Sequence, residues 1–155
     1  MICSLLLPLF FILILHIDTI SGLDECQKFS GEEKGIDMHQ VGSYIIFEDD
    51  SVRVWNFTLD VGEFTSMHTH PSDYYFVANK PSQLEVYDEN CNVLFDFTAA
   101  GTMGFKASGD ELIPIRVELP WKVPVTHAAK NIGDSVYNEF LFELKGVGQN
   151  HPKEL

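Results

Sequence analysis

Short runs of β-favouring residues alternate with turn residues from Gly42 onward, and no long segment shows the 3.6-residue hydrophobic period of a helix. The longest of these runs is 52–61. One face of it carries Trp55, Phe57, Leu59 and Val61, and the other carries Asn56, Thr58 and Asp60. This alternation is typical of a strand with one buried side. Roughly eight to ten such strands, with frequent turns between them, predict a β-sandwich or a β-barrel.

The turn residues set the expected limits of the other strands. Those strands are predicted at 43–48, 64–70, 74–78, 83–87, 93–98, 111–119, 123–129 and 137–145. Residues 79–82 are expected to connect two of them, and 88–92 form a strong turn. In the last run Phe140, Phe142 and Leu144 alternate with Leu141, Glu143 and Lys145, as expected for one buried face. Helix is expected only near 36–41.

The first residues of the 155-residue chain differ in composition from the rest. The apolar run 2–17 is shorter than the about 20 residues that a spanning helix needs, and small residues follow it near Gly22. We interpret 1–22 as a secretory signal peptide, with an uncleaved anchor as the alternative, because no Lys or Arg precedes the apolar run. The predicted organisation is then an N-terminal arm at 23–42, one barrel domain at 43–147 and a C-terminal tail at 148–155.

The net charge limits the classes of binding partner, and the cysteine content bears on the cellular compartment. Removing the one acid of the leader, Asp18, from a chain of net charge −13 leaves about −12. Such a chain lacks the basic face that nucleic acid or an anionic membrane surface requires. Cys26 and Cys91 remain after cleavage, either as a disulfide or as two thiols. The predicted localisation is extracellular, with the ER lumen as the less favoured alternative.

Two further signals concern processing. Residues 56–58 form the N-glycosylation sequon Asn-Phe-Thr, inside a predicted strand. The C-terminal residues 153–155 read Lys-Glu-Leu, but Pro152 and Lys153 depart from an ER-retention tail.

The candidate chemistry lies in His68-Thr69-His70, which follows a turn at Gly62. Residues i and i+2 of a strand point to the same side, so both imidazoles can reach one point. Imidazole is the commonest metal-binding side chain near neutral pH, and His127 on a distant strand offers a third. Taken alone, a His-x-His pair is also compatible with ordinary surface or core histidines.

The same residues resemble the motifs of the cupin superfamily. Its first motif is G-x5-H-x-H followed by a Glu, and Gly62, His68 and His70 fit its first part. His127 and Asn131 match the end of its second motif, P-x-G-x2-H-x3-N. Tyr74 and Tyr75 occupy the two positions permitted for the Glu, and Lys122 and Pro124 stand where Pro and Gly are expected. The resemblance covers about Ser43 to Lys145 and implies a jelly-roll β-barrel.

The resemblance also implies a metal site inside the barrel. Its ligands would be His68, His70 and His127 around a divalent transition metal: Fe, Zn, Mn, Cu or Ni. Tyr74, in the place of the Glu, would point inward and act on substrate, or else would be an ordinary core aromatic. Asp73 is a weaker candidate for a fourth ligand, because a turn Asp commonly caps its own backbone.

The remaining polar residues are expected to lie outside the chemistry. Asn131 is interpreted as a turn residue, and His39 and His151 as surface residues.

Three functions fit these observations. The first is a secreted metal-dependent enzyme, an oxygenase or isomerase of a small polar metabolite. The second is a non-catalytic barrel that binds a small molecule and has lost the metal chemistry. The third is a structural or storage protein, for which the sequence holds no specific signal. A homodimer remains open as the assembly state.

Overall fold

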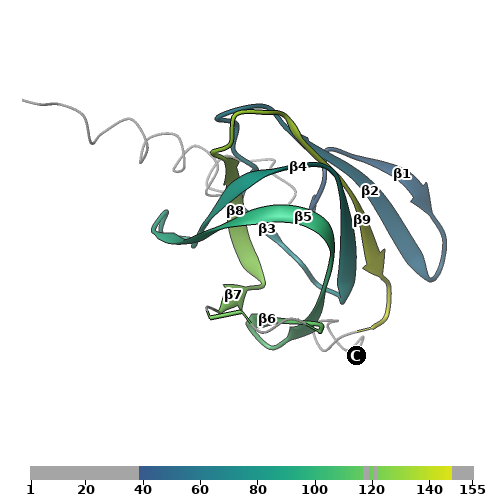
Figure 1. The fold of residues 1–155 in the computed structure, drawn as a ribbon. Coiled ribbons are helices and arrows are strands. Elements are labelled where there is room, and N and C mark those ends of the chain that lie inside the picture. The colour runs from purple at the N-terminus through teal and green to yellow at the C-terminus, as the bar shows by residue number, and fades with distance from the viewer. Residues whose placement is uncertain (1–38, 117–118, 121, 148–155) are drawn as a thin grey trace, which may run out of the picture.

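The computed structural model describes residues 39–116, 119–120 and 122–147, and every regular element in these residues is a β-strand (Figure 1). The predicted all-β class is therefore confirmed. The strands are β1 (Tyr44–Glu48), β2 (Val52–Leu59), β3 (His68–Thr69), β4 (Tyr74–Tyr87), β5 (Val93–Ser108), β6 (Glu111–Pro114), β7 (Val123–Pro124), β8 (Thr126–Asn131) and β9 (Tyr137–Leu144).

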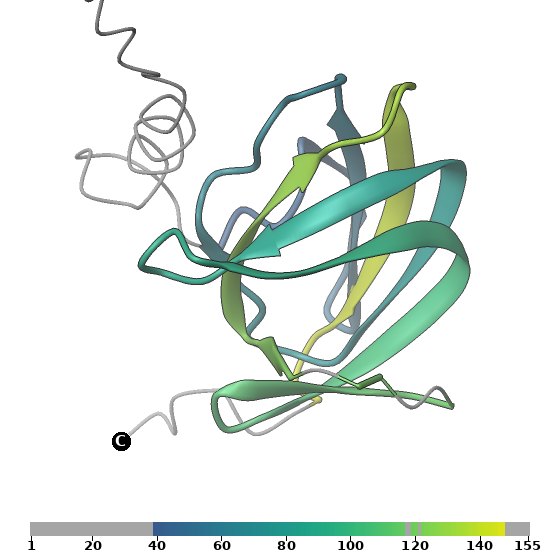
Figure 2. The ribbon, with the colours of Figure 1, turned by 60° about the vertical axis from the view of Figure 1, so that its left-hand side comes forward.

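Antiparallel pairing joins the strands around a common interior. Along the sheet the order is β1-β2-β9-β4-β5-β6-β7, while β8 pairs with both β3 and β4. Figures 1 and 2 show the strands curving around this interior, with β8 and β3 lying across from β9 and β2. Segments far apart in the sequence therefore line the inside of one barrel.

β4 is a single long strand where the sequence predicted two strands and a connection. Its first part, to Lys80, pairs with β9, and its last part, from Leu84, pairs with β8. The register with β5 shifts between Ala78 and Ser82, around Pro81, which has no N–H to donate. The predicted break at 79–82 is therefore an irregularity at which β4 passes from one neighbour to the next.

Several other strand limits differ from the predicted ones. β5 runs on to Ser108 because it follows β4 along its full length. The run predicted at 64–70 is reduced to the two residues of β3 and an isolated bridge between Phe64 and Lys130, and the strand expected at 111–119 ends at Pro114. The turn at 88–92 is as predicted: Asp88 Oδ1 accepts the backbone N–H groups of Asn90 and Asn92, each at 2.8 Å.

The burial of β2 confirms its predicted alternation, with one exception. Trp55, Phe57 and Leu59 are buried, whereas Val61 lies beyond the end of the strand and is 56% exposed. Asn56 is half-buried on the opposite face, where its Oδ1 accepts a hydrogen bond from Thr58 Oγ1 at 3.0 Å. Glycosylation at this residue stays a prediction.

β9 turns an unexpected face toward the interior. Its buried residues are Tyr137, Glu139, Leu141 and Glu143, while the alternate positions, which include Phe140 and Phe142, are only half-buried. Hydrophobicity alone favours the phenylalanine face. The structure instead aims two carboxylic side chains inward.

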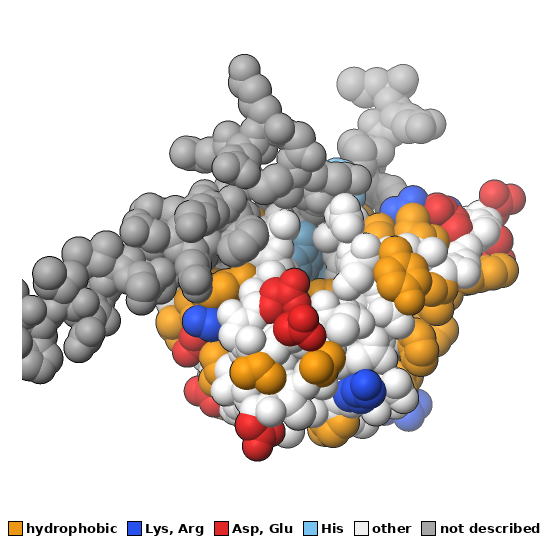
Figure 3. Space-filling view, turned by 90° about the horizontal axis from the view of Figure 1, so that it is seen from above, with side chains coloured by type: hydrophobic (Ala, Val, Ile, Leu, Met, Phe, Trp, Pro, Cys, Tyr) orange, Lys and Arg blue, Asp and Glu red, His pale blue; other side chains and the backbone are white. Residues whose placement is uncertain are grey.

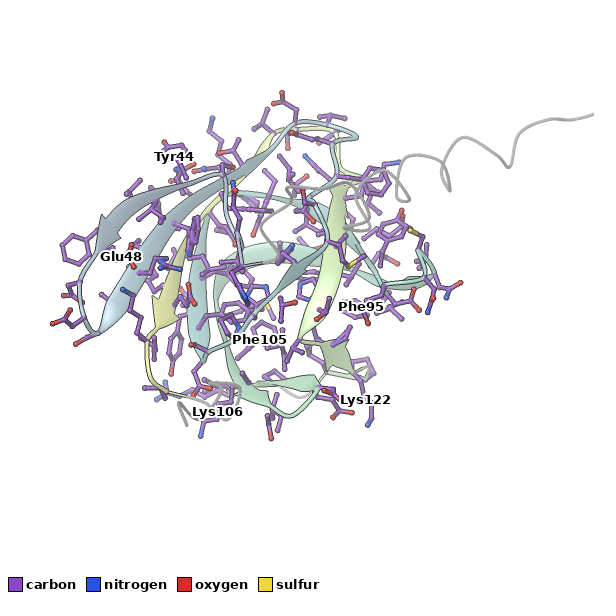
Figure 4. The ribbon with its side chains drawn as sticks, turned by 180° about the vertical axis from the view of Figure 1, so that it is seen from behind. Tyr44, Glu48, Phe95, Phe105, Lys106 and Lys122 are labelled. Carbon is purple, nitrogen blue, oxygen red and sulfur yellow. The ribbon has the colours of Figure 1, made fainter. Side chains whose placement is uncertain are left out.

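β1 is the edge strand of the sheet, and all five of its residues are exposed. Figure 4 shows Tyr44 and Glu48 at its two ends, on the outside of the barrel, and Phe105 in the interior. Phe105 belongs to a buried cluster with Trp55, Tyr74 and Phe76. The homodimer stays a prediction.

Some predictions fall on residues outside the described ones. These are the leader at 1–22, most of the arm at 23–42, Cys26 and the tail at 148–155. Of the helix expected near 36–41, only 39–41 are described, and they are not helical. Among the described residues, no helix has the length and hydrophobicity to span a membrane.

Candidate metal centre

Strand pairing brings the three predicted histidines together. His68 on β3 lies directly opposite His127 on β8, and His70 follows one residue after β3. The ring centroids are 5.0 Å apart for His68 and His70, 4.9 Å for His68 and His127, and 5.1 Å for His70 and His127. One ligand nitrogen from each ring lies within 4.8 Å of the other two. His68 and His70 thus lie on the same side of the chain, as their i and i+2 positions predicted.

Hydrogen bonds orient two of the three rings. The Nδ1 atom of His68 lies 2.9 Å from the Ser66 carbonyl oxygen, and Nδ1 of His127 lies 2.8 Å from the Pro124 carbonyl oxygen. A carbonyl oxygen only accepts, so each Nδ1 carries the proton and each Nε2 keeps a lone pair. Metal-binding histidines are typically held in this way, which fixes both the tautomer and the ring direction.

Burial keeps the three imidazoles neutral. Desolvation lowers the pKa of His68 and, with neighbouring histidines adding to it, lowers the pKa of His127 to about 3 and that of His70 well below its ordinary value. A metal ligand must be a neutral imidazole, so no proton competes with an ion at neutral pH. Three nitrogen donors of this kind suit Zn, Cu, Fe and Ni. The residues therefore fit a divalent transition metal.

Tyr74 lies inside the barrel beside this group, where the resemblance placed it. Its ring stacks on His70, with centroids 4.2 Å apart and planes at 16°, and on Phe105 at 5.3 Å. Burial raises the pKa of the Tyr74 phenol well above its ordinary value, and the nearby Glu139 raises it further. The phenol is therefore neutral at pH 7, and a neutral phenol is a poor metal ligand but a good hydrogen-bond donor.

Two other candidates have structural roles. Asp73 is buried, but its Oδ1 accepts the backbone N–H of Ala107 at 2.9 Å, and it is not part of the three-residue ligand group. Asn131 is fully buried at the end of β8. Its amide donates to the carbonyls of Leu59 and Ser135, and its oxygen accepts from Ser82 Oγ at 2.8 Å. Both side chains therefore fasten neighbouring segments to each other.

The histidines and Tyr74 line a cavity of about 80 Å³ in the barrel interior. Thirteen of its nineteen lining residues are aliphatic, phenylalanine or methionine, so its walls are mostly apolar. Drug-sized ligands occupy pockets of about 300–1,000 Å³, and this cavity is suited to a much smaller molecule.

A second hollow, of about 490 Å³ and lined partly by Ser43, Thr58, Glu63 and Ser66, shares His68 with the cavity. Seen from above, histidine atoms are visible at the floor of a hollow in the middle of this face (Figure 3).

The sequence reasoning missed two polar residues of the cavity, Tyr137 and Glu139 on β9. The Tyr137 hydroxyl donates to Glu139 Oε2, and both side chains are buried. Burial raises the pKa of Glu139 to about 7, against the opposing effect of the Tyr137 hydrogen bond. The available signal was that Tyr137, Glu139 and Leu141 occupy alternate positions and so share one face of a strand.

Comparisons with known proteins find solved structures with limited similarity to this chain. No protein-family model matches the chain, and no curated protein matches it. A cupin domain from Bordetella pertussis Tohama I is 17% identical, with a TM-score of 0.44, over 72% of this chain and 100% of that one. An RmlC-like cupin family protein with a double-stranded β-helix fold, from Methanocaldococcus jannaschii, is 13% identical, with a TM-score of 0.42, over 72% and 90%.

Both of these similar structures are described as cupins. Identity is low and both TM-scores lie below 0.5, so the likeness says nothing about substrate or reaction. The fold and the three-histidine group are described from the strand pairing and distances of this chain alone.

Proposed function

We propose that the protein binds one divalent transition metal through His68, His70 and His127 and acts on a small molecule in the adjoining cavity. The observation that supports this most directly is the convergence of three buried, neutral imidazoles whose ligand nitrogens lie within 4.8 Å of one another. Neutral ligands leave the full charge of the ion in place. When bound, such an ion would supply a Lewis acid that polarises an oxygen of the substrate.

Within this proposal Tyr74 orients the substrate and does not hold the ion. Its ring stacks against His70, and its side chain lines the same cavity as the imidazoles. A neutral phenol can donate a hydrogen bond to a substrate oxygen. Tyr74→Phe should keep the metal and weaken ligand binding or turnover. Loss of metal from this variant would make Tyr74 a ligand instead.

Metal analysis of purified protein tests the proposed centre. The wild type should carry close to one ion per chain, and His68→Ala and His127→Ala should each lose it. The exposed His39 provides the control, and His39→Ala should keep the wild-type metal content. Full metal content in both site variants would overturn the proposal.

The second candidate is a small-molecule-binding barrel without catalysis, which the mostly apolar lining of the cavity favours. The two candidates differ in turnover. A metal-loaded protein that binds small molecules but converts none of them, aerobically or anaerobically, supports the binding function. Conversion that disappears in His127→Ala supports the enzyme.

We also propose that residues 1–22 are removed during export. The short apolar run and the small residues near Gly22 support this. N-terminal sequencing of secreted material should begin near residue 23. Intact Met1 on membrane-bound protein would identify an anchor.

A disulfide between Cys26 and Cys91 is part of the same proposal, because an exported chain meets oxidising conditions. Cys91 is buried beside Phe64, Met67 and Tyr87. Non-reducing peptide mapping should recover one linked pair, and two alkylatable thiols in the native protein would contradict it.

A further inference from the structure

The cavity contains polar atoms that the protein does not satisfy internally. Glu139 is 6% exposed, and the structure gives it one side-chain hydrogen bond among the described residues, from the Tyr137 hydroxyl to Oε2. Its other carboxyl oxygen, Oε1, has no partner within the described part of the chain. The same is true of the Tyr74 hydroxyl, on a side chain that is 5% exposed. Buried polar atoms without partners cost about 1–3 kcal/mol each, which makes them candidates for ligand binding.

The two unpartnered groups lie at different levels of one cavity. In the pairing of β4 with β9, Tyr74 lies opposite Glu143 and Ala78 lies opposite Glu139. Glu139 is therefore four residues further along the sheet than Tyr74, or about 13 Å between Cα levels at the usual rise per residue. Phe76 and Leu141, which face each other between these Cα levels, add apolar surface to the cavity wall.

The charges of the cavity restrict its ligand. Among the described residues, its lining includes no Lys or Arg, and its acidic group is Glu139. An anionic ligand would have to place its charge near this carboxyl without a cationic side chain to compensate. A molecule without any polar group would leave Glu139 and Tyr74 buried and unsatisfied. The lining thus favours neither a charged metabolite nor a hydrocarbon.

We propose that Glu139, positioned by Tyr137, is a ligand-binding residue, and that the cavity takes small, uncharged, largely apolar molecules that carry a hydroxyl group. A hydroxyl both donates and accepts, so it can bond with a carboxyl in either protonation state. The apolar body of the ligand would lie against Phe76 and Leu141. This inference rests on the proposed function and deepens it, and it replaces the polar metabolite expected from the sequence with a mostly apolar molecule.

Glu143 offers a matched control. It lies on the same face of the same strand and is also 6% exposed, but it is not part of the cavity lining. Its Oε2 accepts the Trp55 indole N–H at 3.2 Å and lies 3.8 Å from the Arg53 guanidinium. Replacing either glutamate by Leu removes a buried carboxyl from the same face of β9, but only the change at Glu139 alters the cavity lining.

Binding of three probes of similar size tests the proposal: phenol, toluene and benzoate, measured by calorimetry on purified protein with and without added metal. Phenol should bind the wild type at least tenfold more tightly than toluene or benzoate. Glu139→Leu should weaken phenol binding at least tenfold and leave toluene binding unchanged or stronger. Glu139→Gln, which still accepts a hydrogen bond, should stay within about threefold of the wild type. Glu143→Leu, the same change outside the cavity lining, should also keep wild-type phenol binding within about threefold.

Equal binding of phenol and toluene by the wild type, or tighter binding of benzoate, overturns the inference, and so does unchanged phenol binding by a folded Glu139→Leu. Because the first comparison uses the wild type alone, the test stands even if the Leu variant does not fold. Metal content is measured on the same samples. Absence of metal uptake with retained phenol selectivity contradicts the metal centre alone, and normal uptake without selectivity contradicts this inference alone.

Discussion

Glu139 and Glu143 are buried to the same extent on one face of β9, yet their surroundings differ. Glu143 receives the Trp55 indole N–H and lies near Arg53, so a donor and a cation surround its carboxylate. Glu139 receives one tyrosine hydroxyl and otherwise faces an apolar cavity. The first arrangement satisfies a buried charge within the fold, and the second leaves binding capacity for something else.

Buried polar side chains elsewhere in the barrel differ in the same way: some have protein hydrogen-bond partners, and others have atoms without one. Asn131 at the end of β8 has hydrogen-bond partners for both its oxygen and its amide, and they come from three different segments. The histidines, Tyr74 and Glu139 keep acceptor or donor atoms that point to no protein partner in the described residues. Removing a satisfied group should therefore cost stability, whereas removing a cavity group should cost binding and can raise stability.

Asn131→Ala should give the largest loss of stability, about 4 kcal/mol, because it leaves the Leu59 and Ser135 carbonyls and the Ser82 hydroxyl without this partner. Urea denaturation of wild type and variant measures it. Metal content of the folded variant should be unchanged. A loss below 1 kcal/mol would remove Asn131 from the group of structural polar residues.

Glu139→Gln should change the pH dependence of stability. Burial raises the pKa of Glu139 from 4.5 to about 7 in the folded state, so the wild type binds this proton more tightly when folded. Its stability then falls as pH rises from about 4.5 to 7, by on the order of 3 kcal/mol. The variant lacks this contribution and should be more stable than the wild type at pH 8, with little difference at pH 4.5. The same difference in unfolding free energy between variant and wild type at pH 4.5 and at pH 8 would contradict this.

Glu143→Gln should lose about 1–2 kcal/mol at pH 7, because the interaction with the half-buried Arg53 is weakened while the Trp55 hydrogen bond can persist. The loss should be visible as a lower denaturation midpoint with an unchanged slope. A gain in stability like that expected for Glu139→Gln would show that the two glutamates do not differ in the way described.

Glu48→Gln should have the smallest effect on stability, and it adds an exposed carboxyl to the comparison of the two buried ones. Arg53 and Lys145 hold the pKa of this exposed carboxyl at about 2. Its contribution is therefore present above pH 4.5 and is lost as pH falls toward 2. Solvent screens the interaction of Glu48 with Arg53 and Lys145, so the difference in melting temperature between wild type and Glu48→Gln should be small. It should be smaller still in 1 M salt. A salt-independent difference would contradict this.

The sequence predicted the histidine group because its geometry follows from local rules. His68 and His70 share a side of the chain by strand periodicity, and His127 is placed by the cupin-like motif. Glu139 was not predictable in the same way. The alternation in β9 is visible, but hydropathy favours the face with Phe140 and Phe142, and only tertiary pairing decides which face is enclosed.

In the fold, too, some features follow from local sequence and others depend on tertiary pairing. An all-β barrel follows from the spacing of strands and turns, and the turn at Asp88 follows from its side-chain hydrogen bonds. The continuity of β4 past Pro81 depends on a change of partner strand from β9 to β8. The same residue types favour a turn between two strands and an irregularity within one strand. The local sequence around Pro81 therefore cannot distinguish the two.

The shortness of β3 has a consequence for how quickly an ion could leave. Two residues of β3 pair with β8, and the backbone N–H groups of Thr65 and His70 extend this attachment by donating to the carbonyls of Ala129 at 2.8 Å and Val125 at 2.9 Å. Two of the three imidazoles, His68 and His70, belong to this segment, while His127 sits on the longer β8. An ion held by all three would fasten the segment to the barrel, and its residence time would follow the rate at which the segment detaches. Amide hydrogen exchange at residues 66–70 would then slow on metal loading.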